Sequence, residues 1–185
     1  MHNIKKISTL HAKLWRYHDE KKWDELEYFS KEFLISLGNS EVLAAELAPL
    51  VKETFLISDM AEKCKDERKF NQEDKKYKQI KHIFENIYIK LNQNKKVAKY
   101  KVKWIYYSRH KNKKTQMLLN LFLEYLALFS IRRILLVIKL TWISTKFVYP
   151  SHKKHDWEAL EKAFYKYWKE INKSLKEPKV LPPQF

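Results

Sequence analysis

The residues best suited to chemistry lie in one basic and aromatic stretch, KVAKYKVKWIYYSRHKNKK, at positions 96–114. Lysine and arginine side chains neutralise phosphates, and the release of counterions then drives the binding of a polyanion. Exposed aromatic rings stack on unpaired bases, each contributing about 1–3 kcal/mol. The stretch therefore predicts a nucleic-acid-binding surface made of Lys95, Lys96, Lys99, Lys101, Lys103, Trp104, Arg109, Lys111, Lys113 and Lys114.

The formal charge of the chain is concentrated around this stretch. Residues 1–60 carry a net charge of −2, residues 61–115 carry +12 and residues 116–185 carry +6, within a total of +16. No acidic residue occurs between Glu85 and Glu124. Such clustering of like charges indicates a polyanionic partner. RNA is favoured over DNA, because single-stranded RNA presents unstacked bases and the sequence shows no helix-turn-helix pattern.

Other interpretations of the stretch remain open. Read with a period of 3.6 residues, Val97, Tyr100, Trp104 and Tyr107 share one helical face, which is typical of a core helix with solvated lysines opposite. Read with a period of two, lysines and apolar residues alternate over 99–104, as in a half-exposed strand. We favour a helix over 97–107, because no second strand is available for pairing. An acidic protein or an anionic membrane surface would also complement the charge.

A histidine group near the C-terminus has a spacing that fits metal binding. His152 and His155 are separated by two lysines and followed by Asp156. The two lysines repel a cation, and structural zinc sites usually have four ligands, often cysteines. We therefore expect a solvated loop and a helix cap at these positions rather than a metal site.

Enzymatic chemistry is weakly indicated elsewhere. His11 and His18 lie two helical turns apart, a spacing that allows general acid–base chemistry but is more typical of a polar helix face. Arg109 and His110 supply half of the Arg-x4–6-His element of HEPN ribonucleases, without its spacing. Cys64 is the only cysteine, so no intramolecular disulfide forms and an inert thiol is expected. We expect no catalytic residue, metal or cofactor, with nuclease-type acid–base chemistry as the alternative.

The composition restricts the fold that must position these residues. The chain of 185 residues contains one glycine, Gly38, and 45% apolar residues. Tight turns, phosphate-binding loops and β-bulges rely on glycine, so a Rossmann fold, a P-loop or a sheet-rich fold is disfavoured. The length suffices for one sizeable core. We expect an all-α, single-domain bundle or stack of about five to seven helices with an extended C-terminal tail.

Apolar residues at helical spacing and capping residues predict where the helices begin and end. Gly38 is expected to close the second helix, and Ser40, Asn71 and Asp156 to cap the third, fourth and last. Pro49 is expected to break or kink the third helix. The predicted helices span about 4–18, 22–37, 41–64, 72–91 and 157–176.

The most apolar segment, 116–147, raises the question of a membrane span. A span needs about 18 or more apolar residues with few charges, and charged residues interrupt every such window here. We predict a buried amphipathic helix that ends at Pro150, with a strand near 134–145 as the alternative. The polar residues that share one third of the helical wheel are Asn120, Glu124, Arg132, Lys139 and Lys146.

These patterns define a domain organisation and a functional hypothesis. The helical domain spans 1–177, with near-neutral hairpins at 1–64, a basic segment at 65–115, and an apolar and an amphipathic helix in 116–177. An extended tail follows at 178–185. We expect an intracellular protein, cytoplasmic or in an organellar matrix, that binds RNA as a non-catalytic subunit of a larger assembly. The alternative is a protein-interaction module, or a membrane-surface protein, that docks through 116–147.

Overall fold

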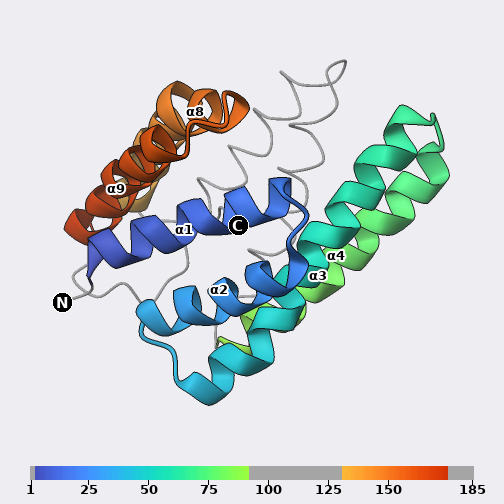
Figure 1. The fold of residues 1–185 in the computed structure, drawn as a ribbon, viewed down its shortest axis with the longest axis horizontal. Coiled ribbons are helices and arrows are strands. Elements are labelled where there is room, and N and C mark those ends of the chain that lie inside the picture. Colours follow the sequence, from blue (N-terminus) through green and yellow to red (C-terminus); the bar gives the residue numbers. More distant parts are fainter. Residues whose placement is uncertain (1–2, 92–130, 175–185) are drawn as a thin grey trace. The chain divides into compact units, whose positions relative to one another are not determined.

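The computed structural model of the chain describes residues 3–91 and 131–174. Every regular element in these residues is a helix, and no strand occurs among them. They form six helices when the continuous run from 131 to 153 is taken as one (Figure 1). The all-α fold class and the expected helix number are therefore confirmed for the described residues, whereas the extended tail at 178–185 lies outside them.

Contacts within the chain group it into two compact units. The first contains residues 1–52 and 130–181, and the second contains residues 53–129 and 182–185. The division of 1–177 into near-neutral, basic and apolar parts, predicted from the sequence, stays a prediction.

The core of the first unit is built by three amphipathic helices. Helix α1 (Ile4–Asp19) packs along both α2 (Trp23–Ser36) and α9 (Trp157–Ser174) (Figure 1). The Thr9 hydroxyl of α1 donates a 2.7 Å hydrogen bond to Oε1 of Glu161 in α9. The apolar stripes predicted from the sequence meet in this core, where Leu14, Leu26, Phe33, Leu34, Leu160 and Phe164 are each at most 1% exposed.

Three of the predicted helix-end residues act as expected. Gly38 follows α2 with φ at 91°, the left-handed conformation that glycine adopts at low cost. The hydroxyl of Ser40 accepts a hydrogen bond from the backbone N–H of Leu43, at the start of α3 (Glu41–Asp66). The carboxylate of Asp156 accepts one from the N–H of Ala159, at the start of α9. These local signals position the turns between the helices.

Three other helix ends adopt the left-handed conformation without glycine. Lys21, Arg68 and His155 have φ of 57°, 58° and 52° and follow α1, α3 and α8 (Tyr149–Lys153). This conformation costs a side chain with a Cβ about 1–2 kcal/mol. The chain has only one glycine, Gly38, and these three helices end with basic residues instead.

We predicted a break or kink at Pro49. The break is wrong, because α3 continues through this residue, and the kink stays a prediction. An internal proline removes a backbone donor and costs roughly 3 kcal/mol. Apolar side chains on either side of Pro49 are buried, and a helix end here would expose part of this stripe. The burial of Ala44, Leu47, Ala48 and Val51 therefore favours the continuous helix.

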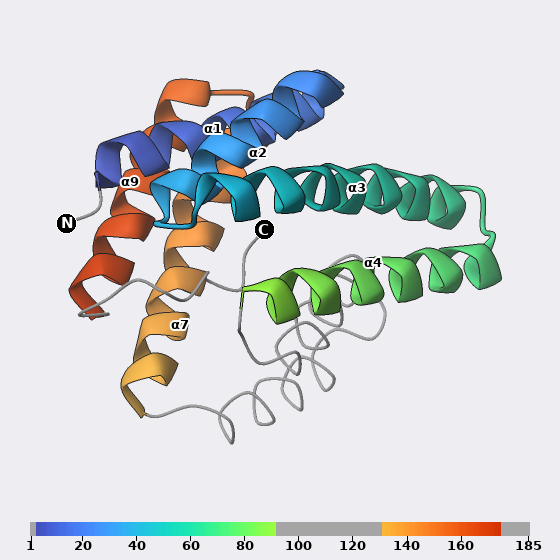
Figure 2. The same ribbon diagram turned by 90° about the horizontal axis from the view of Figure 1, so that it is seen from below.

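The second unit contains the part of α3 from Glu53 onward and α4 (Phe70–Lys90). These two helical segments lie side by side in both views (Figure 2). The apolar stripe predicted for the fourth helix is buried, with Tyr77, Ile80, Phe84 and Ile87 at most 5% exposed.

The prediction that Asn71 caps this helix is wrong. Helix α4 begins at Phe70 with Lys69 as its N-cap, so Asn71 lies inside the first turn. The carbonyl of Lys69 accepts hydrogen bonds from the backbone N–H groups of Gln72 and Glu73. The short turn closed by Arg68 starts the helix early, and a side-chain cap contributes only about 1 kcal/mol to shift it.

The apolar segment continues as one helical run through α7 (Ile131–Ile143), the π-helical segment η2 (Ser144–Val148) and α8. The strand alternative near 134–145 is therefore wrong, and so is the predicted end at Pro150. The π turn lets Pro150 occupy the first turn of α8, where its missing N–H is not needed. None of the described helices is long and apolar enough to cross a bilayer, and residues 116–130 lie outside the described part.

Candidate functional site

The binding surface predicted from the sequence lies outside the residues that the structure describes. All of its members, from Lys95 to Lys114 and including Trp104 and Arg109, belong to the range 92–130. The helix or strand predicted over 97–107 lies in the same range. These assignments stay predictions, and the described residues contribute other candidate sites.

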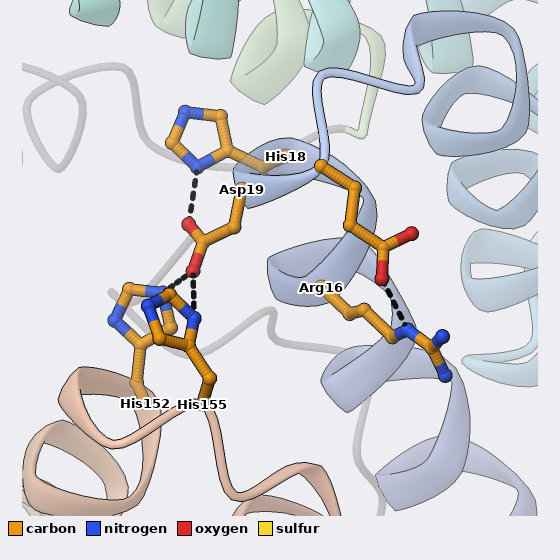
Figure 3. A network of polar contacts seen from close by, with 6 residues as sticks. Arg16, His18, Asp19, His152 and His155 are labelled. Carbon is orange, nitrogen blue, oxygen red and sulfur yellow. Dashed lines mark hydrogen bonds and ion pairs between the residues drawn. The ribbon is translucent and has the colours of Figure 1, made fainter.

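A polar cluster gathers three histidines around one carboxylate in the first unit (Figure 3). We call His18, Asp19, His152 and His155 the Asp19 cluster. Oδ2 of Asp19 lies 2.8 Å from Nε2 of His152 and 3.5 Å from Nδ1 of His155, and Oδ1 lies 3.5 Å from Nδ1 of His18. Nε2 of His152 is buried and meets the carboxylate at ion-pair distance, without the alignment of a regular hydrogen bond. The carboxylate of Asp19 thus contacts all three imidazole rings.

Two helix ends place these side chains next to one another. His18 and Asp19 are the last two residues of α1, and His152 is in the last turn of α8. His155 is the left-handed residue that closes α8, and its N–H donates to the carbonyl of His152. Because α8 leads into α9, which packs along α1, the α8–α9 turn reaches the end of α1.

Tryptophan rings surround the imidazoles of the cluster. The ring of Trp15 meets that of His152 edge-on, with centroids 4.5 Å apart. Trp157 lies 5.5 Å from His155, and Trp23 lies 6.0 Å from His18, measured between ring centroids. These apolar contacts orient the rings, so the cluster is a packed junction between helices.

An ion-paired group follows the Asp19 cluster at the end of α1. Nε of Arg16 donates a 2.6 Å hydrogen bond to Glu20, and Nζ of Lys22 lies 2.8 Å from the same carboxylate (Figure 3 shows the first contact). The hydrogen bonds from Lys22 and Arg16 lower the pKa of Glu20, and the bond to Glu20 raises the pKa of Lys22. The group remains partly exposed, and it neutralises the charge at this helix end.

The chemistry available to the Asp19 cluster is limited by its contacts. No group of three or more His, Cys, Asp or Glu side chains in the described ranges could hold a metal ion. The imidazoles approach the oxygens of Asp19 itself rather than a common empty point. Among the described residues, no hydroxyl or thiol forms a hydrogen bond to the imidazole of His152 or His155, and a carboxylate–imidazole pair activates a nucleophile only through such a bond.

His11, considered with His18 as an acid–base pair, lies in the core. It is 2% exposed, and its ring stacks on Phe164 with centroids 3.7 Å apart. The indole N–H of Trp168 donates to Nδ1 of His11 over 3.2 Å. An imidazole that accepts at Nδ1 is not protonated there, and it is shielded from substrate by the surrounding rings. His11 is thus a packed core residue, separate from the Asp19 cluster.

A second surface feature arises where η2 interrupts the helical run. On an α-helix, residues five apart point about 140° away from each other. The π turn brings residues at this separation onto one face, and the rings of Trp142 and Phe147 meet edge-on with centroids 5.5 Å apart. Nζ of Lys146 lies 4.9 Å from the Trp142 ring centroid, and Nζ of Lys166 lies 4.3 Å from that of Phe147. We call these four residues the aromatic–lysine patch.

Helix α7 extends this patch with exposed apolar side chains. Leu135, Ile138 and Trp142 are 62%, 48% and 53% exposed and follow one another at helical spacing. Lys139 lies between them in sequence and forms a 2.7 Å ion pair with Glu170 of α9. The hydrogen bond from Lys139 lowers the pKa of Glu170. The outer face of α7 is therefore apolar, whereas Lys139, one of the polar residues predicted to share a face, is paired with α9.

Sequence reasoning found the members of the Asp19 cluster but not the cluster. The sequence groups His18 with His11, and His152 with His155, as two separate pairs. The signal that could have joined them is that each group stands at a helix end, next to tryptophan residues. The alternative of docking through 116–147 did not say which residues are exposed, because helical periodicity cannot tell which of two apolar faces is buried.

Comparisons with known proteins add no further indication of function. No protein-family model, curated protein or solved structure matches this chain.

Proposed function

We propose that the protein binds RNA as a non-catalytic subunit of a larger assembly, with the basic stretch 95–114 as its phosphate-facing surface. The observation that carries the proposal is the separation of charge along the chain. No acidic residue occurs between Glu85 and Glu124, whereas residues 1–60 are nearly neutral. Clustered like charges repel one another, and an anionic partner would relieve this repulsion.

Ion pairs in the described residues support this contrast. Within residues 1–60, basic side chains are neutralised by neighbouring acids: Lys31 lies 2.8 Å from Glu41, and Lys52 pairs with Glu27. These contacts raise the pKa of Lys31 and the pKa of Lys52 through hydrogen bonds from the ammonium groups. Such internal pairing leaves little field for an external anion.

Helix α4, which leads toward the basic stretch, has a different balance. Its lysines Lys75 and Lys78 are exposed, while Glu73 is buried and Glu85 is engaged by Lys81 at 3.4 Å. The exposed charge of α4 therefore adds to that of the stretch. Long-range attraction of this kind accelerates the encounter with a polyanion.

The test is a salt-titrated binding assay with single-stranded RNA, duplex DNA and anionic vesicles. We would compare the unmodified protein with a variant in which Lys99, Lys101, Lys103 and Arg109 are changed to Gln. If these four side chains contact phosphates, the slope of log affinity against log salt should fall by roughly 3 units, since each contact on a single strand contributes about 0.7.

A matched control removes four charges elsewhere. Lys5, Lys153, Lys154 and Lys169 are all exposed in the first unit, and changing them to Gln gives the same net charge. The proposal requires this control to retain most of the RNA affinity. Equal affinities and salt slopes in both variants would reject the basic stretch as the binding surface. Tighter binding to duplex DNA, or to vesicles with a loss in the same four-residue variant, would reject RNA as the partner of this stretch.

A further inference from the structure

The outer face of α7 exposes three large apolar side chains in succession, a pattern that is unusual for a helix face in contact with water. Leu135, Ile138 and Trp142 are about half exposed or more, although the opposite face of the same helix is buried through Leu140 and Ile143. A helix that is apolar on two faces usually has a partner on each. Helix α9 packs against α7 and covers one face.

Cationic groups without a described acidic partner accompany this apolar face. Among the described residues, neither Lys146 nor Lys166 forms an ion pair with a carboxylate, and both ammonium groups lie over aromatic rings. Lys139, in contrast, is committed to Glu170. The face thus combines aliphatic groups and an indole of α7 with two available positive charges, one from η2 and one from α9.

We infer that this face rests on the surface of an anionic lipid bilayer. Leu135, Ile138 and Trp142 would enter the boundary between headgroups and acyl chains, where indole rings are favoured. The flexible stems of Lys146 and Lys166 allow their ammonium groups to reach lipid phosphates while the stems stay on apolar surface. The helix lies in the plane of the membrane, in keeping with the lack of a described helix that could cross it.

The mixture of apolar and cationic groups on this face favours a bilayer over RNA or a protein as its partner. RNA could stack on Trp142, but the aliphatic side chains of Leu135 and Ile138 would gain nothing from bases or phosphates. A protein groove that is only apolar would bury the two lysines without counter-charges, at a desolvation cost, so a protein partner would need carboxylates placed at both lysines. An anionic bilayer accepts both kinds of group, because its apolar layer and its charged layer are adjacent.

Flotation of the full chain with lipid vesicles tests this inference. The vesicles are phosphatidylcholine alone and phosphatidylcholine mixed with phosphatidylserine. We expect binding to the anionic vesicles and a loss of at least about tenfold in the Leu135→Ser, Trp142→Ser variant, since apolar burial drives insertion. Changing Lys146 and Lys166 to Gln should weaken binding about fivefold per lysine at low salt, and less at high salt.

Controls separate this face from general effects and from the basic stretch. Tyr28 and Val42 are 60% and 71% exposed on other helices, and changing both to Ser removes similar apolar surface. All variants are also measured with Lys99, Lys101, Lys103 and Arg109 changed to Gln, so that attraction by the basic stretch is weakened. Circular dichroism melts check that each variant remains folded.

The possible results decide between this inference and the proposed function. A lack of binding to phosphatidylserine vesicles, or equal losses in the Trp142 and Tyr28 variants, would overturn the membrane surface. A Trp142 variant that loses RNA affinity but keeps vesicle binding would also overturn it, and would assign the face to RNA. Loss of RNA binding in the basic-stretch variant, with vesicle binding retained, would support both proposals independently.

Discussion

Two histidines of the same helix, seven residues apart, meet opposite environments. His11 lies in the core of the first unit, where an indole N–H donates to it and an aromatic ring stacks on it. His18 lies at the helix end, partly exposed, next to a carboxylate that also serves His152 and His155. The sequence alone does not distinguish the two histidines, and their environments in the fold show that His11 is a core residue and His18 a surface residue.

The difference shows how an imidazole can be stabilised in two ways. In the core, a directional hydrogen bond from Trp168 and close ring packing hold His11. At the helix end, one carboxylate contacts several imidazole rings that are partly exposed, and water competes for the same contacts. We therefore expect the two regions to differ in their contribution to stability, and five variants test this difference, from the largest effect to the smallest.

Replacing His11 with Ala should have the largest effect. The change leaves a cavity among Phe33, Phe164 and Trp168 and deprives the indole N–H of its acceptor, so we expect a loss of about 3 kcal/mol in unfolding free energy. Urea denaturation measures it.

The His11→Phe variant divides this loss into its two parts. A phenyl ring fills the space and stacks on Phe164, but it cannot accept the hydrogen bond of Trp168. We expect a loss of about 1–2 kcal/mol, the cost of one buried unpaired donor. A His11→Ala variant as stable as the unmodified protein would contradict the packed core role.

The Asp19→Ala variant should show the next largest effect. It removes the acceptor shared by three rings and leaves the buried Nε2 of His152 without its carboxylate, so we expect a loss of about 1–2 kcal/mol. Asp24→Ala is the matched control, because Asp24 is fully exposed and 3.7 Å from Lys52. Equal effects of the two substitutions in thermal or urea unfolding would mean that the Asp19 cluster contributes nothing.

The same two regions show what the sequence could predict about the fold. The periodic apolar stripes and the caps Gly38, Ser40 and Asp156 are local signals, and each predicted its helix or turn correctly. The errors at Asn71 and Pro150 arose where a neighbouring turn changed the backbone path. A side-chain preference of about 1 kcal/mol cannot resist such a change.

The candidate site was less predictable, for a different reason. Asp19 and His152 are far apart in the sequence, and their contact depends on how α8 and α9 pack against α1. Nothing in either local pattern encodes that packing. The burial of His11 likewise results from three helices together, which periodicity along one helix does not describe. The basic stretch 95–114 remains a prediction from charge alone.

The His155→Gly variant should stabilise the protein slightly. The left-handed backbone at His155 costs about 1 kcal/mol that glycine avoids, and the ring that is lost is 66% exposed. Arg68→Gly relieves the same conformation after α3, in the second unit. The difference in melting temperature gain between the two variants measures the His155–Asp19 contact. Destabilisation by His155→Gly alone would show that this contact outweighs the backbone strain.

The Glu20→Gln variant should have the smallest effect, and one that depends on pH. Because hydrogen bonds from Lys22 and Arg16 hold the pKa of Glu20 below its usual value of 4.5, the ionised carboxylate is the form that stabilises the fold. The difference in unfolding free energy between the two proteins should be largest at neutral pH. It should disappear as the pH falls below 4.5 and through the lowered pKa of Glu20. Unfolding curves across this pH range test it, and a difference that grows on acidification would contradict the ion-paired arrangement.

The π turn at Ser144–Val148 also sets the rotational phase of everything that follows it. A π turn absorbs one extra residue by turning less per residue than an α-helix does. If the same residues wound as regular α-helix instead, the downstream segment would rotate by about 100° and move along the axis by about 1.5 Å. The imidazole of His152 would then turn away from Asp19, and the side chains of Trp142 and Phe147 would point about 140° apart. The directions of the Asp19 cluster and of the aromatic–lysine patch therefore both depend on this one absorbed residue.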